Sequence, residues 1–199
     1  MERLRGPTRP WGALTLVLAS RSPQRRAILE QLGVPFVVRP VDVEEDGVGE
    51  PQEVALANAR RKALAAGAAE GEVVLGVDTI VAIDGEIWGK PADADAAAAT
   101  LRRLAGHTHT VVSGVAILYA DGSVEPATAT TAVTFRELTT SVVDWYVATG
   151  EWEGRAGGYA IQGRGAALVE RIEGDYLNVV GLPVAMLVDL WPWVLDLST

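Results

Sequence analysis

Residues 14–26 read LTLVLASRSPQRR, and this stretch decides the expected fold because it joins a short apolar run to a helix start. Its first six residues have the length and hydrophobicity of a buried strand. Ser22-Pro23 then supplies an N-cap residue followed by proline at the first helical position. Gly33 is suited to end this helix, and a second apolar run follows at residues 34–38. The segment therefore predicts a strand–helix–strand unit at the start of an α/β fold.

The rest of the chain alternates apolar runs with helix signals. Two long strand-like runs, residues 108–119 and 124–135, are joined by Asp121-Gly122 and predict an antiparallel hairpin at one edge of the main sheet. Further strands are expected at residues 73–77, 79–83, 86–88 and 167–172, and further helices at residues 51–67, 96–104, 140–148 and 183–190. The sequence thus predicts a mixed central sheet flanked by helices, with a substrate cleft, in one domain over residues 13–199 behind a loose extension at residues 1–12.

The composition excludes several classes of site and partner. The chain of 199 residues holds 26 acidic and 17 basic residues, a formal net charge of -9, so nucleic acids and anionic membranes should repel it. It has no cysteine, which removes disulfides, thiolate nucleophiles and Cys-ligated metal sites. Its apolar C-terminal stretch is interrupted by Pro183, Asp189, Pro192 and Asp196, so no membrane span is expected. We therefore expect a cytoplasmic protein with no nucleic-acid and no membrane partner.

The junction after the first strand is a candidate anion site. A helix N-terminus presents backbone N–H groups that carry partial positive charge. Ser20, Ser22 and Arg25 add hydroxyl and guanidinium donors there. The alternative is an ordinary capped helix with solvated arginines, and the segment alone does not decide between the two.

Three carboxylates are candidates for catalysis and metal binding. Asp78 follows the apolar run 73–77, and an aspartate that ends a strand is often delivered to the cleft at the carboxyl end of a sheet. Glu44 and Glu45 lie in an acidic loop, and carboxylate oxygens suit Mg²⁺. In the alternative interpretation Asp78 caps a turn and the two glutamates are solvated loop charges.

Two further segments have the composition of ligand-binding loops. Lys90 follows Gly89 directly after the expected hairpin, so a point charge lies beside backbone that a ligand can approach closely. Residues 154–165 are rich in glycine, and Gln162 among them offers both a donor and an acceptor to a base edge. The alternatives are an ordinary turn lysine and a mobile surface loop.

Two other groups of polar side chains are given structural roles. His107 and His109 lie two residues apart on a strand-like run with no third ligand nearby, so a zinc site is not expected. Arg60, Arg61 and Lys62 are interpreted as a solvated helix face rather than a nucleic-acid patch, because the chain as a whole is acidic.

Six motifs follow one another along residues 16–190. They are Leu18-Ala19-Ser20-x-Ser22-Pro23-x-Arg25, Gly76-x-Asp78-Thr79, Gly89-Lys90-Pro91, Gly106-x-x-His109, Ala156-Gly157-x-Tyr159-x-Ile161-Gln162-Gly163 and Val179-Val180-Gly181-Leu182-Pro183. Together they resemble the Maf family of nucleoside triphosphate pyrophosphatases.

The resemblance implies a fold shared in outline with inosine triphosphate pyrophosphatases. It also implies hydrolysis of the α–β phosphoanhydride of a nucleoside triphosphate, with a divalent cation, Mg²⁺ or Mn²⁺, as cofactor. Asp78 matches the proton acceptor for the attacking water. The remaining implied roles are triphosphate binding by Ser20, Arg25 and Lys90, metal binding by Glu44, Glu45 and Asp78, substrate binding by Gln162, and specificity through Gln24, Thr79 and Gln162.

The same resemblance implies a substrate branch. Residues 159–163 (Tyr-Ala-Ile-Gln-Gly) are similar to the branch that acts on dTTP and UTP, whereas Gln24 and Arg60 stand where arginine and lysine are usual. The alternatives are a 7-methyl-GTP pyrophosphatase and a non-hydrolysing nucleotide-binding regulator of cell division. A homodimer is a further family expectation, and four tryptophans are candidates for its interface or for the core: Trp145, Trp152, Trp191 and Trp193.

Overall fold

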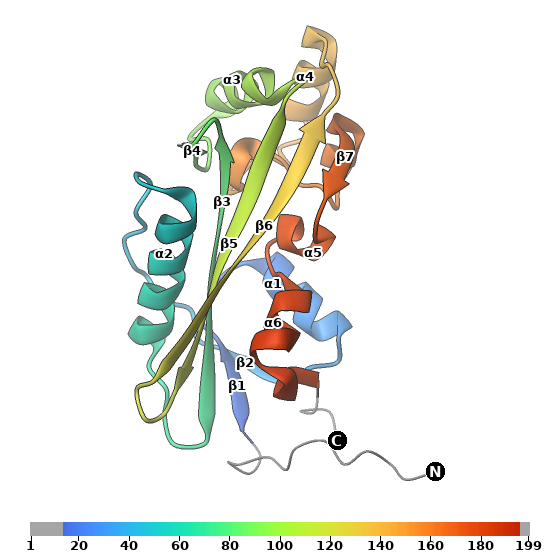
Figure 1. Cartoon of the computed structure of the whole chain (residues 1–199). Coiled ribbons are helices and arrows are strands. Elements are labelled where there is room, and N and C mark those ends of the chain that lie inside the picture. Colours follow the sequence, from blue (N-terminus) through green and yellow to red (C-terminus); the bar gives the residue numbers. More distant parts are fainter. Residues whose placement is uncertain (1–13, 196–199) are drawn as a thin grey trace.

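A mixed β-sheet runs the length of the protein, with helices on both of its faces (Figure 1). The structure is a computed structural model that describes residues 14–195, so the extension predicted at residues 1–12 lies outside the described residues. In the described range the strands are β1 (Thr15–Leu18), β2 (Phe36–Val38), β3 (Glu72–Ile83), β4 (Glu86–Trp88), β5 (Thr108–Tyr119), β6 (Val124–Phe135) and β7 (Val169–Glu173). The helices are α1 (Pro23–Gln31), α2 (Pro51–Ala66), α3 (Ala94–Leu104), α4 (Thr140–Val147), α5 (Tyr176–Val180) and α6 (Val184–Leu190), with short 3₁₀ turns at Ala156–Gly158, Arg164–Leu168 and Pro192–Leu195.

The strand order confirms the predicted mixed sheet. It is β2-β1-β3-β5-β6-β7, and β4 pairs with β3 outside this path. The pairings of β1 with β2 and with β3 are parallel, and the other pairings are antiparallel. The hairpin of β5 and β6 forms as expected. Its predicted place at the edge is right only in part, because β7 covers residues 132–135 of β6, whereas residues 124–131 pair with β5 alone in the described structure. β5 is buried along nearly its whole length, as suits a central strand.

Strand β3 is longer than predicted. The sequence predicts two strands, residues 73–77 and 79–83, with Asp78 at the end of the first. The structure has one continuous strand over Glu72–Ile83, because β5 pairs with it through Asp78 without a break. Asp78 therefore lies in the middle of a strand.

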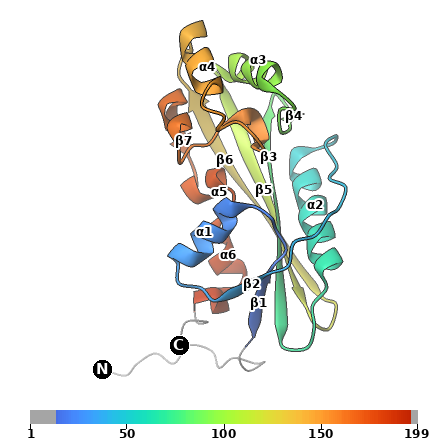
Figure 2. The same cartoon turned by 180° about the vertical axis from the view of Figure 1, so that it is seen from behind.

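Helix α2 packs unusually close to the sheet. A Cβ atom at Gly76 of β3 would overlap the carbonyl oxygen of Ala59, and one at Gly114 of β5 would overlap that of Ala55. The two glycines and the small alanine side chains thus let the helix backbone rest on the strands. Figures 1 and 2 show α2 on one side of the long strands and α1, α5 and α6 on the other.

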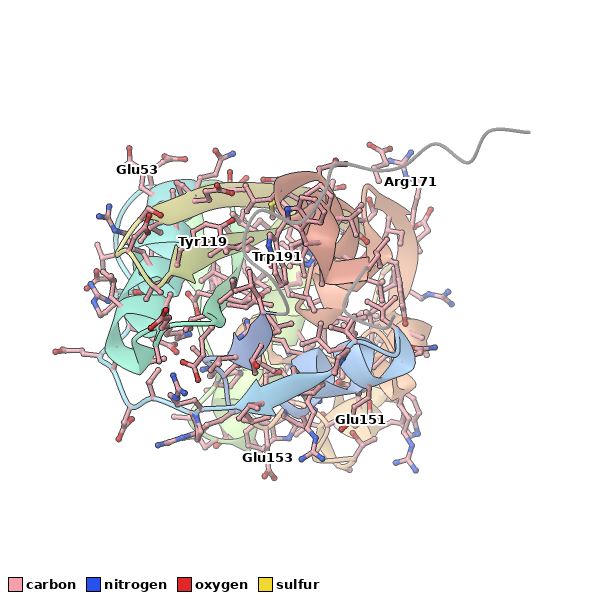
Figure 3. The ribbon with its side chains drawn as sticks, turned by 90° about the horizontal axis from the view of Figure 1, so that it is seen from below. Glu53, Tyr119, Glu151, Glu153, Arg171 and Trp191 are labelled. Carbon is pink, nitrogen blue, oxygen red and sulfur yellow. The ribbon has the colours of Figure 1, made fainter. Side chains whose placement is uncertain are left out.

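The opposite face of the sheet carries a larger core. Leu29 of α1, Leu187 of α6 and Trp191 pack there against β1, β3 and β5. Trp191 is only 2% exposed and lies near the centre of the molecule seen from below (Figure 3), so it belongs to the core rather than to a free surface. Trp145, by contrast, is 47% exposed.

Within residues 14–195, no helix has the length and hydrophobicity needed to cross a membrane.

One edge of β3 is interrupted, and this interruption positions the site. Parallel β1 covers residues 72–75 of that edge, and β4 covers residues 81–83 further along. Figure 1 shows β1 at the lower end of β3 and β4 at its upper end. Residues 76–80 between them pair with β5 alone in the described structure. We call this stretch the β3 gap.

Candidate active site

A cavity of about 520 Å³ lies at the β3 gap. Residues that follow β1 and residues that follow β4 both line it, because each of these strands ends at the gap. The loop between α4 and β7 lines another part of the wall. The cavity brings together most of the site residues predicted from the sequence: Ser20, Gln24, Arg25, Glu45, Asp78, Thr79, Lys90 and Gln162.

Asp78 is buried in the cavity floor and held by helix α2. One carboxylate oxygen accepts a hydrogen bond from Lys62 Nζ at 2.7 Å, and the other accepts one from Asn58 Nδ2 at 3.0 Å. Burial acts to raise the pKa of Asp78, but the Lys62 ammonium, the Asn58 amide and the Arg25 charge outweigh it, so the pKa lies below its ordinary value. Asp78 is therefore ionised at neutral pH, and each of its oxygens retains a lone pair for a further donor.

Glu45 faces the same lysine from the loop before α2. Its carboxylate lies 2.7 Å from Lys62 Nζ and 3.4 Å from Lys90 Nζ. Burial acts to raise the pKa of Glu45, but the hydrogen bond and charge of Lys62, together with the Lys90 charge, outweigh it, so the net pKa is below the ordinary value. Glu45 and Asp78 thus converge on one ammonium group.

This convergence fits a divalent cation in part. A carboxylate or two, completed by water and substrate phosphates, is the set that Mg²⁺ prefers, and Glu45 with Asp78 offers it. Glu44 is not brought to this point: its side chain is exposed and outside the cavity lining, while its carbonyl oxygen accepts a hydrogen bond from Arg61. In the part of the chain that the structure describes, no three His, Cys, Asp or Glu side chains gather as a metal site.

Arg25 is buried in the wall formed by α1. Its Nε donates to the Gly181 carbonyl at 2.8 Å, and its two terminal nitrogens donate to Ser20 Oγ and Thr79 Oγ1, each at 3.0 Å. Burial lowers the pKa of Arg25 and the Asp78 charge acts in the opposite direction. A guanidinium has five N–H donors, so Arg25 retains two for a ligand.

The start of α1 is capped as predicted. Ser22 Oγ accepts from the backbone N–H of Arg25 at 3.5 Å and donates to Gln24 Oε1 at 3.1 Å. Gln24 is partly buried and lines the cavity, so the structure places this unusual residue where a ligand can reach it. The anion site predicted at this helix start therefore opens into the same cavity as Asp78.

The glycine-rich segment closes the cavity on another side. Gln162 is exposed, lines the cavity, and makes no side-chain hydrogen bond to any residue in the range 14–195. Tyr159 beside it is buried, and its hydroxyl lies 2.8 Å from His109 Nε2. Burial lowers the pKa of His109 to about 4, so this histidine is neutral and serves to hold Tyr159.

Sequence reasoning missed Asn58 and Lys62. The prediction of a solvated helix face is wrong for Lys62, whose side chain is 10% exposed. The signal was present, because Asn58 and Lys62 are four residues apart and share a helix face with the buried Ala55, Ala59 and Ala63. Two polar residues on an otherwise buried stripe indicate a buried polar partner, which is Asp78.

Comparison with known proteins defines the family. The family model described as "Maf-like protein" matches residues 15–191. A dTTP/UTP pyrophosphatase from Moorella thermoacetica is 49% identical over 180 residues, which cover 88% of this chain and 92% of that protein. A dTTP/UTP pyrophosphatase from Pyrococcus furiosus is 45% identical over 178 residues, which cover 88% and 93%. The chain belongs to the Maf-like protein family, and the resemblance predicted from its motifs is confirmed.

Solved structures match more weakly. A dITP/XTP pyrophosphatase from Mycobacterium abscessus aligns with a TM-score of 0.41 and 20% identity, covering 63% of this chain and 76% of that one. A HAM1 protein from Coxiella burnetii aligns with a TM-score of 0.45 and 18% identity, covering 61% and 73%. The predicted α/β class is confirmed by the protein's own sheet and helices.

Proposed function

We propose that the protein hydrolyses dTTP and UTP to the nucleoside monophosphate and pyrophosphate. The observation that carries this proposal is the cavity at the β3 gap, where an ionised, buried Asp78 lies among cationic groups. Gln162, whose side-chain amide makes no hydrogen bond within the described residues, lines the same space. The names of relatives that are 45–49% identical support the choice of substrate.

Asp78 is proposed to orient the attacking water and to accept its proton. Its two oxygens are fixed by Lys62 and Asn58, so the remaining lone pairs have set directions. The lowered pKa keeps the carboxylate charged. A fixed, charged acceptor suits a reaction that depends on positioning more than on covalent chemistry.

The triphosphate carries about four negative charges, which catalysis must offset. Arg25 offers two free N–H donors, Lys90 is half exposed at the cavity wall, and the N-terminus of α1 adds backbone N–H groups. A bound divalent cation would neutralise phosphate charge and polarise the phosphoryl oxygens. Glu45 and Asp78 are the residues proposed to hold it.

Base selection is proposed to rest on Gln162. A side-chain amide can donate to O4 and accept from N3–H of uracil or thymine at once. Thr79 Oγ1 is already bonded to Arg25 and lies 2.9 Å from Ser113 Oγ, so its contribution is to position the arginine. Gln24 lines the cavity and is available to the ligand directly.

The test is a product analysis of the purified protein with Mg²⁺ or Mn²⁺ and a panel of triphosphates. The expected result is monophosphate plus pyrophosphate, with the highest kcat/KM for dTTP and UTP and no turnover after chelation of the metal. Orthophosphate plus diphosphate, or no product, would contradict the proposal. A preference for 7-methyl-GTP would retain the pyrophosphatase activity and overturn the choice of base.

The proposal includes a homodimer acting in the cytoplasm. Light scattering at two concentrations tests the dimer, and the half-exposed Trp145 is the described tryptophan best placed to report on an interface by its fluorescence.

A further inference from the structure

Arg155 is a cation in the cavity wall whose side chain has no hydrogen-bond or ion-pair partner among residues 14–195. It lines the cavity, and its Nε is buried with no hydrogen-bond acceptor. Across residues 14–195 its guanidinium forms no ion pair, although Glu151 and Glu153 are close in sequence. Buried donors in folded proteins nearly always have an acceptor, so an arginine in this state requires an explanation.

The loop that carries Arg155 is fixed in place rather than free to move to a partner. The N–H of Gly157 donates to the carbonyl of Gly89 at 3.1 Å. Gly157 has a φ of 66°, and a Cβ there would meet Val81 at 2.8 Å, while one at Gly158 would meet Pro91 at 3.0 Å. The two glycines therefore hold the loop against the segment that presents Lys90.

The other cations of the cavity already have protein partners. Arg25 donates to three oxygens, and Lys62 lies between two carboxylates. Lys90 lies 3.4 Å from Glu45. Arg21, which also lines the cavity, lies 3.9 Å from Asp42. Arg155 is thus the cavity cation whose charge the described protein leaves unopposed.

We propose that Arg155 binds the phosphate chain of the substrate. The inference rests on the proposed function. A guanidinium has only donors, arranged as a planar fork that matches two oxygens of a phosphate group. A pyrimidine edge needs a donor and an acceptor together, which Gln162 supplies and Arg155 does not. The chemistry of the residue therefore points to phosphate rather than to the base.

The experiment measures binding of inorganic tripolyphosphate by calorimetry, without a divalent cation, to the wild type and to Arg155→Met, Arg155→Lys and Arg164→Met. Arg164 is the matched control, because it lies in the same glycine-rich segment, is exposed, and does not line the cavity. We expect Arg155→Met to weaken binding about 10- to 100-fold, since hydrogen bonds to charged groups contribute roughly 1.5–3 kcal/mol. The affinity of Arg155→Lys for tripolyphosphate should lie between those of the wild type and Arg155→Met. The affinity of Arg164→Met should lie within twofold of the wild-type value.

A second readout separates phosphate binding from base recognition. Arg155→Met should lower kcat/KM for dTTP and ATP by the same factor, because both share the phosphate chain, and should leave the melting temperature unchanged. Unchanged tripolyphosphate affinity in Arg155→Met, no binding by the wild type, or a changed dTTP-to-ATP ratio would each overturn the inference. If the wild type binds tripolyphosphate through Arg155 but hydrolyses no nucleotide, the proposed function fails and the inference stands.

Discussion

The cavity has two halves that differ in how their polar groups are bonded. On the side of α1 and α2, Asp78, Lys62 and Arg25 are buried and hydrogen-bonded to other protein groups. On the side of the 153–162 loop, Arg155 and Gln162 line the same cavity with no side-chain hydrogen bond to the described chain. We call these the bonded half and the open half.

The bonded half and the open half of the cavity suit different tasks. Groups that are already bonded hold their positions without a ligand, which suits the residues that act on the reacting phosphate. Groups without partners gain their bonds only when a ligand arrives, which suits residues that recognise it. Substitutions in the bonded half should therefore change turnover and stability, and substitutions in the open half should change affinity and selectivity.

The largest effect is expected for Asp78→Asn in the bonded half. The amide keeps the size of the side chain but removes the charged proton acceptor, so turnover should fall by at least about 100-fold while nucleotide still binds. Steady-state kinetics together with equilibrium titration of a nucleotide would measure both quantities. Turnover close to that of the wild type would contradict the role of Asp78.

The next effect is expected for Lys62→Met. Removing the ammonium leaves Asp78 buried without its main partner, and we expect the free energy of unfolding at pH 7 to fall by about 3 kcal/mol. Denaturant unfolding measures it. Arg26→Met is the control, because its ion pair with Glu30 is exposed and should contribute less than about 1 kcal/mol.

The pH dependence of the same pair gives a sharper test. In the wild type the pKa of Asp78 is lowered, so its contribution to stability is present at neutral pH and is lost as the pH falls through the folded-state pKa, below 3.8. In Lys62→Met only the Asn58 amide and the Arg25 charge remain to oppose burial, so the pKa of Asp78 should be higher than in the wild type and the ionised carboxylate should contribute less stability at neutral pH. The stability difference between the two proteins should therefore narrow as the pH falls below about 4. A difference independent of pH would show that the pair is not the cause.

A smaller effect on stability distinguishes the two arginines. Arg25→Met removes three hydrogen bonds of a buried guanidinium, so it should lower the free energy of unfolding by about 2 kcal/mol. Arg155→Met removes no hydrogen bond within the described protein, so its free energy of unfolding should stay within about 0.5 kcal/mol of the wild-type value. Equal losses in the two variants would remove the distinction between the halves.

The smallest effect is expected for Gln162→Ala in the open half. The substitution should reduce the preference for dTTP over ATP by about tenfold and leave metal dependence and melting temperature unchanged, since a bidentate base contact contributes roughly 1–3 kcal/mol of discrimination. Parallel kcat/KM measurements with the two nucleotides test it. A uniform loss with both would assign Gln162 to the phosphate chain.

Sequence reasoning succeeded where the signal was local. The cap at Ser22, the hairpin of β5 and β6 and the glycine-rich segment each depend on neighbouring residues, and each formed near its expected place. It failed for Asp78, because the end of a strand is set by where its partner strands stop, which no local pattern records. Lys62 was misplaced for a related reason, since its burial follows from the close packing of α2 on Gly76.

The β3 gap also bears on how this sheet avoids joining another. An unpaired strand edge is a template for β-addition and aggregation, and proteins usually protect it with charge or with short strands. Here the unpaired stretch covers residues 76–80, roughly 17 Å of backbone at strand spacing, and β1 and β4 close it at both ends. A strand of another chain would have to fit between β1 and β4 and pair beside the buried charge of Asp78. A small molecule can enter the gap without pairing with the strand. The same interruption that admits a ligand thus disfavours the pairing of another strand at this edge of β3.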